Sequence, residues 1–170
     1  MRNLLLQHLI IIGIGILIFY LERLEVADLF WEKMIVIIMA MAKCIYFIEH
    51  SFRKIEEASL NNISYNKFLA IILTNILLIV ISFAIDFTCL EQIQPGSFKG
   101  VATAQSMWES SFDFLYLSVV SFTTVAYGDV IPVTKAAKSL TILEVGVAYL
   151  TTIIIISNFV QIKESIEKEK

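Results

Sequence analysis

The stretch Ser121-Phe122-Thr123-Thr124-Val125-Ala126-Tyr127-Gly128-Asp129 decides the fold of this chain. It follows a short apolar segment, residues 112–122, and precedes a long apolar segment, residues 138–159. The short segment makes only about three helical turns, so it cannot cross a bilayer and must end inside protein. Non-helical backbone at membrane depth is tolerated only where it is buried in protein or lines a water-filled cavity. The pattern therefore predicts a pore loop between two membrane-spanning helices.

The composition is that of an integral membrane protein. Of the 170 residues, 58% are hydrophobic and 17% are charged, and the mean hydropathy is +0.78. A soluble domain cannot bury so much apolar surface. The net charge of -3 and the isoelectric point near 5.4 give no basic surface for nucleic acid. Cys44 and Cys89 form neither a disulfide framework nor a metal cluster by their spacing, so we expect them to be apolar packing residues.

We expect an all-α membrane protein with four transmembrane helices and one re-entrant helix. Lys43 lies within about two turns of the end of its span, so its amine can extend to the headgroup layer. Asn75 lies near the middle of a span and should hydrogen-bond a neighbouring helix, because lipid offers no partner. No segment carries a basic residue at every third position, so no voltage-sensing helix is predicted. The predicted spans are residues 4–21, 34–48, 68–87 and 138–159.

The chain divides into four parts. An irregular loop is expected at residues 88–109, and Ser110 followed by Asp113 has the spacing of a helix start. An even number of spans puts both termini on one side, and more of the 13 basic residues fall on that side. The positive-inside rule then makes it the cytoplasmic side. The predicted parts are a helix pair at 1–48, a cytoplasmic linker at 49–67, a pore module at 68–160 and a charged cytoplasmic tail at 161–170.

Residues 68–160 resemble the pore module of tetrameric potassium channels. The resemblance is carried by the motif from Thr123 to Asp129, with Pro132 and Thr134 at the spacing of that family. It implies a homotetramer in the plasma membrane, in contact with lipid and monovalent cations, in which residues 112–122 form the pore helix. The first two predicted helices lie outside the resemblance.

The resemblance also implies which residues bind ions. The hydroxyl of Thr124 and the backbone carbonyls of Thr124, Val125, Ala126 and Tyr127 would replace the hydration shell of K⁺, and Gly128 would complete the filter. Asp129 would form an acidic ring at the outer mouth. No cofactor other than K⁺ itself is expected.

Several positions depart from the family pattern. Ala126 replaces a glycine that takes positive φ, which costs an L-residue roughly 1–2 kcal/mol, so the filter is either strained or of non-standard shape. At Leu117 and Val120 the chain lacks the polar side chains with which relatives brace the filter. Thr123 is the third position expected to support the filter. Ala148 occupies the position of the gating-hinge glycine, and Gly146 can bend instead.

Three further residues follow from the position of the last helix. Thr152 and Ile156 are candidates to line the central cavity, although ordinary packing fits their helical spacing equally well. Glu144 should face the pore helix or another protein group, because a buried carboxyl group needs a partner.

Three functions remain open on the sequence. The first is a passive potassium channel, the second is a cation channel with poor K⁺/Na⁺ discrimination caused by Ala126, and the third is a non-conducting regulatory membrane subunit. An enzyme is not expected, since no nucleophile and base occur at the spacing of a catalytic motif.

Overall fold

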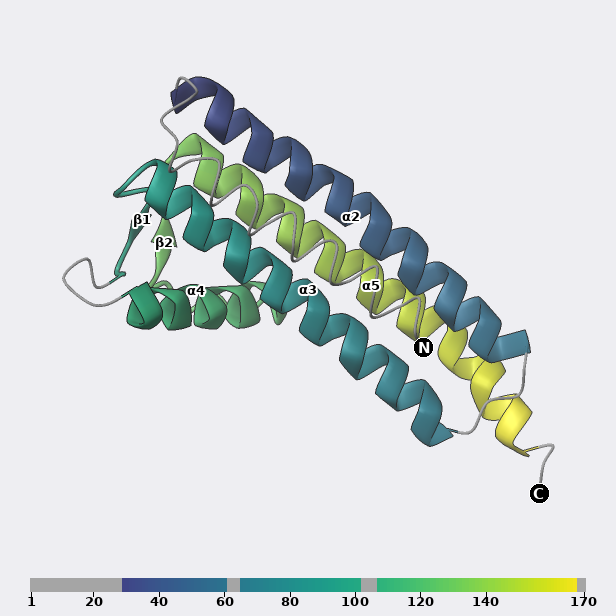
Figure 1. The fold of residues 1–170 in the computed structure, drawn as a ribbon. Coiled ribbons are helices and arrows are strands. Elements are labelled where there is room, and N and C mark those ends of the chain that lie inside the picture. Colours follow the sequence, from purple (N-terminus) through teal and green to yellow (C-terminus); the bar gives the residue numbers. More distant parts are fainter. Residues whose placement is uncertain (1–28, 61–64, 102–106, 168–170) are drawn as a thin grey trace.

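The computed structural model describes residues 29–60, 65–101 and 107–167. The first predicted span, residues 4–21, lies outside the described residues. Figure 1 shows three long helices that run side by side and one shorter helix, α4, set across them near the two strands. The elements are α2 (Leu29–Leu60), α3 (Tyr65–Ile93), β1 (Phe98–Lys99), α4 (Met107–Phe122), β2 (Ile131–Pro132) and α5 (Lys135–Glu167).

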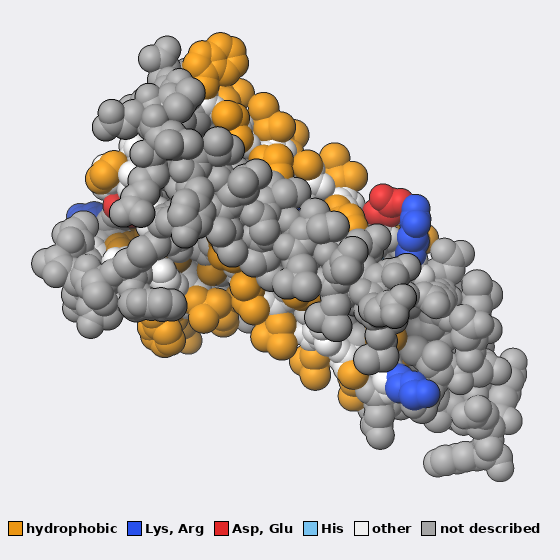
Figure 2. All heavy atoms as spheres, in the orientation of Figure 1, with side chains coloured by type: hydrophobic (Ala, Val, Ile, Leu, Met, Phe, Trp, Pro, Cys, Tyr) orange, Lys and Arg blue, Asp and Glu red, His pale blue; other side chains and the backbone are white. Residues whose placement is uncertain are grey.

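Three of the described helices are long and apolar enough to cross a membrane, which supports an integral membrane protein. The spanning windows are Lys33–Arg53, Lys67–Ile93 and Lys135–Asn158, and they match the second, third and fourth predicted spans. The apolar part of α4, Ser110–Phe122, is shorter. Figure 2 shows hydrophobic side chains over much of the described surface of the bundle, as expected of helices that face lipid.

The helices are longer than the sequence predicted. α2 continues to Leu60, so the first part of the predicted linker is helical, and α3 continues to Ile93 into the predicted loop. α4 begins at Met107, so Ser110 is not its N-cap, and α5 continues to Glu167 into the predicted tail. Glutamate and lysine favour helix, and polar residues beyond the bilayer keep the intrahelical backbone hydrogen bonds. Hydropathy therefore marked where each helix leaves the membrane and not where it ends.

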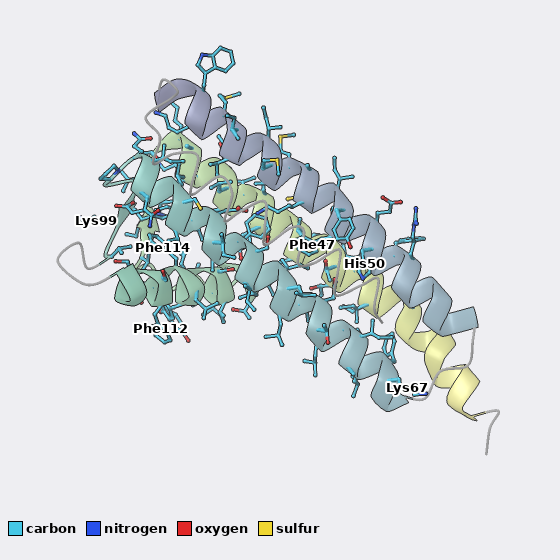
Figure 3. All side chains as sticks on the ribbon, viewed as in Figure 1. Phe47, His50, Lys67, Lys99, Phe112 and Phe114 are labelled. Atoms are coloured by element: carbon cyan, nitrogen blue, oxygen red, sulfur yellow. The ribbon has the colours of Figure 1, made fainter. Side chains whose placement is uncertain are left out.

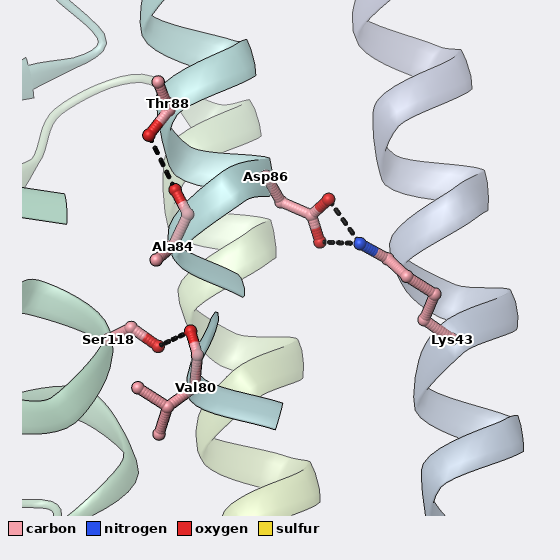
Figure 4. A network of polar contacts seen from close by, with 6 residues as sticks. All are labelled: Lys43, Val80, Ala84, Asp86, Thr88 and Ser118. Carbon is pink, nitrogen blue, oxygen red and sulfur yellow. Dashed lines mark hydrogen bonds and ion pairs between the residues drawn. The ribbon is translucent and has the colours of Figure 1, made fainter. Parts of the chain in front are cut away.

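Two polar contacts join α2 to α3. Asn75 donates from Nδ2 to Ser51 Oγ at 2.6 Å, which confirms that this asparagine bonds a neighbouring helix. Lys43 does not extend to the headgroup layer as predicted: it is buried and forms an ion pair with both carboxylate oxygens of Asp86 (Figure 4). A lysine inside the bundle is stabilised by a facing acid, and Asp86 supplies one from α3.

A row of aromatic rings fixes α4 against the bundle. The ring centroids of Phe87 and Phe98 lie 5.4 Å apart, and those of Phe98 and Phe114 lie 5.1 Å apart, both in edge-to-face geometry. Phe114 points from α4 toward this row and is buried, whereas Phe112 points away from the bundle (Figure 3). Burial of these rings holds the short helix in place, because each ring removes a large apolar area from water.

Candidate pore site

The C-terminus of α4 sets the course of the strand that follows it. The amide of Thr124 donates to Ser121 O at 3.0 Å, and the amide of Val125 donates to Val120 O at 3.1 Å. A pair of hydrogen bonds of this kind, together with a left-handed residue just after the helix, defines a Schellman cap. The left-handed residue is Thr124, with φ 57°. Val120 therefore supports the strand through its backbone carbonyl, while its side chain is buried.

The backbone of residues 124–128 alternates in the sign of φ. Thr124, Ala126 and Gly128 have φ of 57°, 48° and 80°, whereas Val125 and Tyr127 between them are not among the positive-φ residues. Alternation between the two helical regions directs successive N–H groups to one side of a chain. In an alternation of this kind the carbonyl groups lie on the other side of the chain, where a row of carbonyl oxygens can face one ligand or several in file.

Ala126 takes positive φ. Of the two predicted alternatives, a strained backbone or a non-standard shape, this is the strained one. The backbone is therefore strained at this residue, by roughly 1–2 kcal/mol for an L-residue in the left-handed region. Thr124 carries a similar cost, and its place in the helix cap offsets part of it through two backbone hydrogen bonds. Such strain persists only where neighbouring contacts hold the backbone at both ends.

The far end of the strand is held by a side chain that sequence reasoning missed. Tyr116 Oη donates to Asp129 Oδ2 at 2.6 Å, and the amide of Val130 donates to Asp129 Oδ1 at 2.9 Å. The Tyr116 hydrogen bond lowers the pKa of Asp129 and raises the pKa of Tyr116 to about 12. Leu117 and Val120 lack polar side chains, as the sequence showed, and the polar residue directly before Leu117 supplies the bond.

The loop before α4 also supports this end. Gly100 has φ 93°, and a Cβ atom placed there would lie 1.9 Å from the Asp129 carbonyl oxygen, so only glycine fits. β1 pairs with β2 in antiparallel register, with Phe98 opposite Pro132. Asp129 thus contacts the loop after β1 through its backbone and α4 through its side chain, just before β2 begins.

The remaining predicted positions lie on α4 and α5. Leu117 belongs to the hydrophobic core, and Thr123 Oγ1 donates to Val119 O at 2.8 Å. α5 runs as one continuous helix through Gly146, and Ala148 is buried. Thr152 and Ile156 lie on the exposed side of α5, and Thr152 Oγ1 donates to Ala148 O at 2.8 Å.

Glu144 forms a hydrogen bond with α4, which confirms the expectation that it faces protein. The side chain is fully buried, and its Oε1 is hydrogen-bonded to Ser118 Oγ of α4. Ser118 Oγ is also 2.8 Å from the carbonyl oxygen of Val80 on α3 (Figure 4). One hydroxyl group of α4 therefore connects that helix to both α3 and α5.

The strand itself is uncovered in a single chain. Every residue from Thr123 to Asp129 is exposed, and the exposed fractions of Val125 and Tyr127 are 51% and 72%. In the part of the chain that the structure describes, no three His, Cys, Asp or Glu side chains converge on a metal site.

The described chain thus places a short apolar helix, α4, between two helices long enough to cross a membrane, and a strand of alternating φ follows α4. A family model described as "Ion channel" matches residues 69–164, more than half of the chain. The chain therefore belongs to the ion channel family, in agreement with its resemblance to potassium channel pores, and it is a channel protein and not an enzyme.

One curated relative is a potassium channel. Over 115 residues the chain is 31% identical to "Two-pore potassium channel 4" of Arabidopsis thaliana. The match covers 65% of this chain and 38% of the relative, so the chain spans well under half of that protein. No solved structure matches the chain.

Proposed function

We propose that the chain forms a homotetrameric channel that conducts potassium ions through four copies of the strand at residues 124–128. The alternation of φ along this strand is the observation that carries the proposal. Carbonyl oxygens directed to one side can replace the hydration shell of K⁺ as it passes in file. The Thr124 hydroxyl and the carbonyls of Thr124, Val125, Ala126 and Tyr127 would be the ligands.

The exposure of the strand favours assembly. A single strand approaches an ion from one side, whereas replacing a hydration shell needs oxygens from several sides. The exposed side chains of Val125 and Tyr127 are apolar or aromatic and would be covered by neighbouring subunits. In a tetramer, four Asp129 carboxylates would surround the outer mouth and raise the local cation concentration. We place this mouth on the extracellular side of the plasma membrane and both termini in the cytoplasm.

Ion flux into liposomes tests the proposal. Purified protein is reconstituted, and K⁺ and Na⁺ fluxes are compared in the wild type and in Val119→Ala, an exposed pore-helix substitution that serves as a control. We expect K⁺ flux to exceed Na⁺ flux by at least about tenfold, since a difference of about 1.4 kcal/mol in ion binding is sufficient. The absence of flux from a verified tetramer would instead support a non-conducting subunit.

A weakly selective cation channel is the second candidate, and the strained φ of Ala126 favours it. Strain of roughly 1–2 kcal/mol in each subunit can be relieved by a different carbonyl orientation. Ala126→Gly removes the strain, because glycine adopts positive φ without a Cβ penalty. If the second candidate is correct, the wild type passes K⁺ and Na⁺ equally, and Ala126→Gly restores selectivity.

A further inference from the structure

Glu144 is buried without a cationic partner in the part of the chain that the structure describes. The described ion pairs are Lys43 with Asp86 and Arg53 with Glu49, and neither involves Glu144. One of its oxygens, Oε2, is buried with no hydrogen-bond partner. A charged carboxylate in such a place is far more costly than a neutral carboxylic acid.

The number of protons available at Ser118 indicates that the carboxyl group of Glu144 is neutral. A serine hydroxyl carries one proton and two acceptor lone pairs. The carbonyl oxygen of Val80 can only accept, so the single Ser118 proton satisfies that 2.8 Å contact. The contact between Ser118 Oγ and Glu144 Oε1 then needs a second proton, and the carboxyl group is the one donor present.

The charges around Glu144 agree with this count. Asp86 on α3 and Cys44 on α2 interact with it electrostatically, and the positive charge of Lys43 is taken up by Asp86. α4 presents the uncharged Ser118. A carboxylate at Glu144 would therefore add a second buried negative charge that interacts unfavourably with Asp86 and has no cation of its own.

We infer that Glu144 is a protonated positioning residue, whose proton completes a chain from α5 through Ser118 to the backbone of α3 and so fixes the end of the pore helix. The next turn of that helix contains Val120 and Ser121, whose carbonyls cap the start of the filter strand. Loss of the proton leaves two acceptors, Val80 O and Glu144 Oε1, for the one hydroxyl hydrogen of Ser118. The connection then breaks on one side, and the filter loses its support.

The protonation of Glu144 is independent of ion conduction, whereas its effect on the filter rests on the function proposed above. Infrared spectroscopy of the full-length protein in liposomes detects protonated carboxylic acids directly. We expect a protonated-acid band at neutral pH that disappears in Glu144→Gln. The matched control Glu49→Gln changes an exposed, ion-paired carboxylate and should leave the band unchanged. An unchanged band in Glu144→Gln would overturn the inference.

The pH dependence of K⁺ flux tests the positioning role. Glutamine donates to Ser118 Oγ at every pH, so Glu144→Gln should conduct equally in neutral and alkaline buffer. Wild-type flux should fall as the infrared band disappears, by about tenfold for each pH unit above the midpoint, because the protonated fraction falls in that proportion. An identical pH profile in wild type and Glu144→Gln would overturn the positioning role. If no variant conducts, the proposed function fails and the infrared result still decides the protonation of Glu144.

Discussion

Two buried acids in the same helix bundle are stabilised in different ways. Asp86 on α3 faces Lys43, and both of its oxygens contact the amine. Glu144 on α5 faces a serine hydroxyl and leaves one oxygen unpaired. The difference shows that a buried acid can join helices as one half of an ion pair or as a neutral hydrogen-bond donor. The first contact joins α2 to α3, and the second joins α4 to α5.

The ion pair should show the largest effect on stability. Lys43→Met leaves Asp86 buried without a partner, which costs about 3–5 kcal/mol. The double variant Lys43→Met, Asp86→Leu removes both charges and should recover most of that loss, since apolar replacement of a buried pair is often neutral. Unfolding of the purified protein in detergent, followed by circular dichroism, measures both. Equal loss in the single and double variants would show that packing, and not charge, dominates.

A comparison of amide substitutions separates the two acids. Asp86→Asn removes the countercharge of Lys43 and should cost several kcal/mol, because it leaves a buried ammonium group unpaired. Glu144→Gln preserves a donor to Ser118 and should change the free energy of unfolding by less than about 1 kcal/mol. A Glu144→Gln variant as unstable as Asp86→Asn would mean that Glu144 is charged in the native protein. The same unfolding measurement gives both values.

Removal of the Ser118 hydroxyl group, which Glu144 contacts, should have an intermediate effect on the free energy of unfolding. Ser118→Ala takes the partner from Glu144 Oε1 and from one lone pair of the Val80 carbonyl, at a cost of about 1–3 kcal/mol. Ser157→Ala on the exposed side of α5 is the control and should stay within about 0.5 kcal/mol of the wild type. If Ser118→Ala matched this control, the proposed connection between α3, α4 and α5 would contribute nothing to stability.

The smallest effect is expected at a third acid, which is exposed. The hydrogen bond from Tyr116 holds the pKa of Asp129 below its ordinary value of 3.8. A lowered pKa means that this contact stabilises the strand above pH 3.8 and is lost as the pH falls through the lower value. Tyr116→Phe should move the titration of the Asp129 carboxyl group, followed by carbon NMR, back up toward 3.8. No movement would contradict the hydrogen bond as its cause.

The sequence predicted those features that depend on local pattern. The short helix α4 follows from an apolar segment too short to span a membrane, and the hydrogen bond of Asn75 follows from the lack of partners in lipid. The pairs Lys43–Asp86 and Tyr116–Asp129 were missed because their members lie 43 and 13 residues apart, and only the fold brings them together. The helix ends were missed because polar helix formers continue beyond the apolar windows.

The position of ions in an experimental structure of the assembled protein in K⁺ solution tests the central claim most directly. We predict a fourfold assembly with ordered ions in file along its axis, coordinated by the carbonyl groups of Thr124, Val125, Ala126 and Tyr127. Ala126 should keep the positive φ of 48° that aligns its carbonyl with its neighbours. An axis without ions at these carbonyls, or an assembly in which the strands do not face a common axis, would contradict the account.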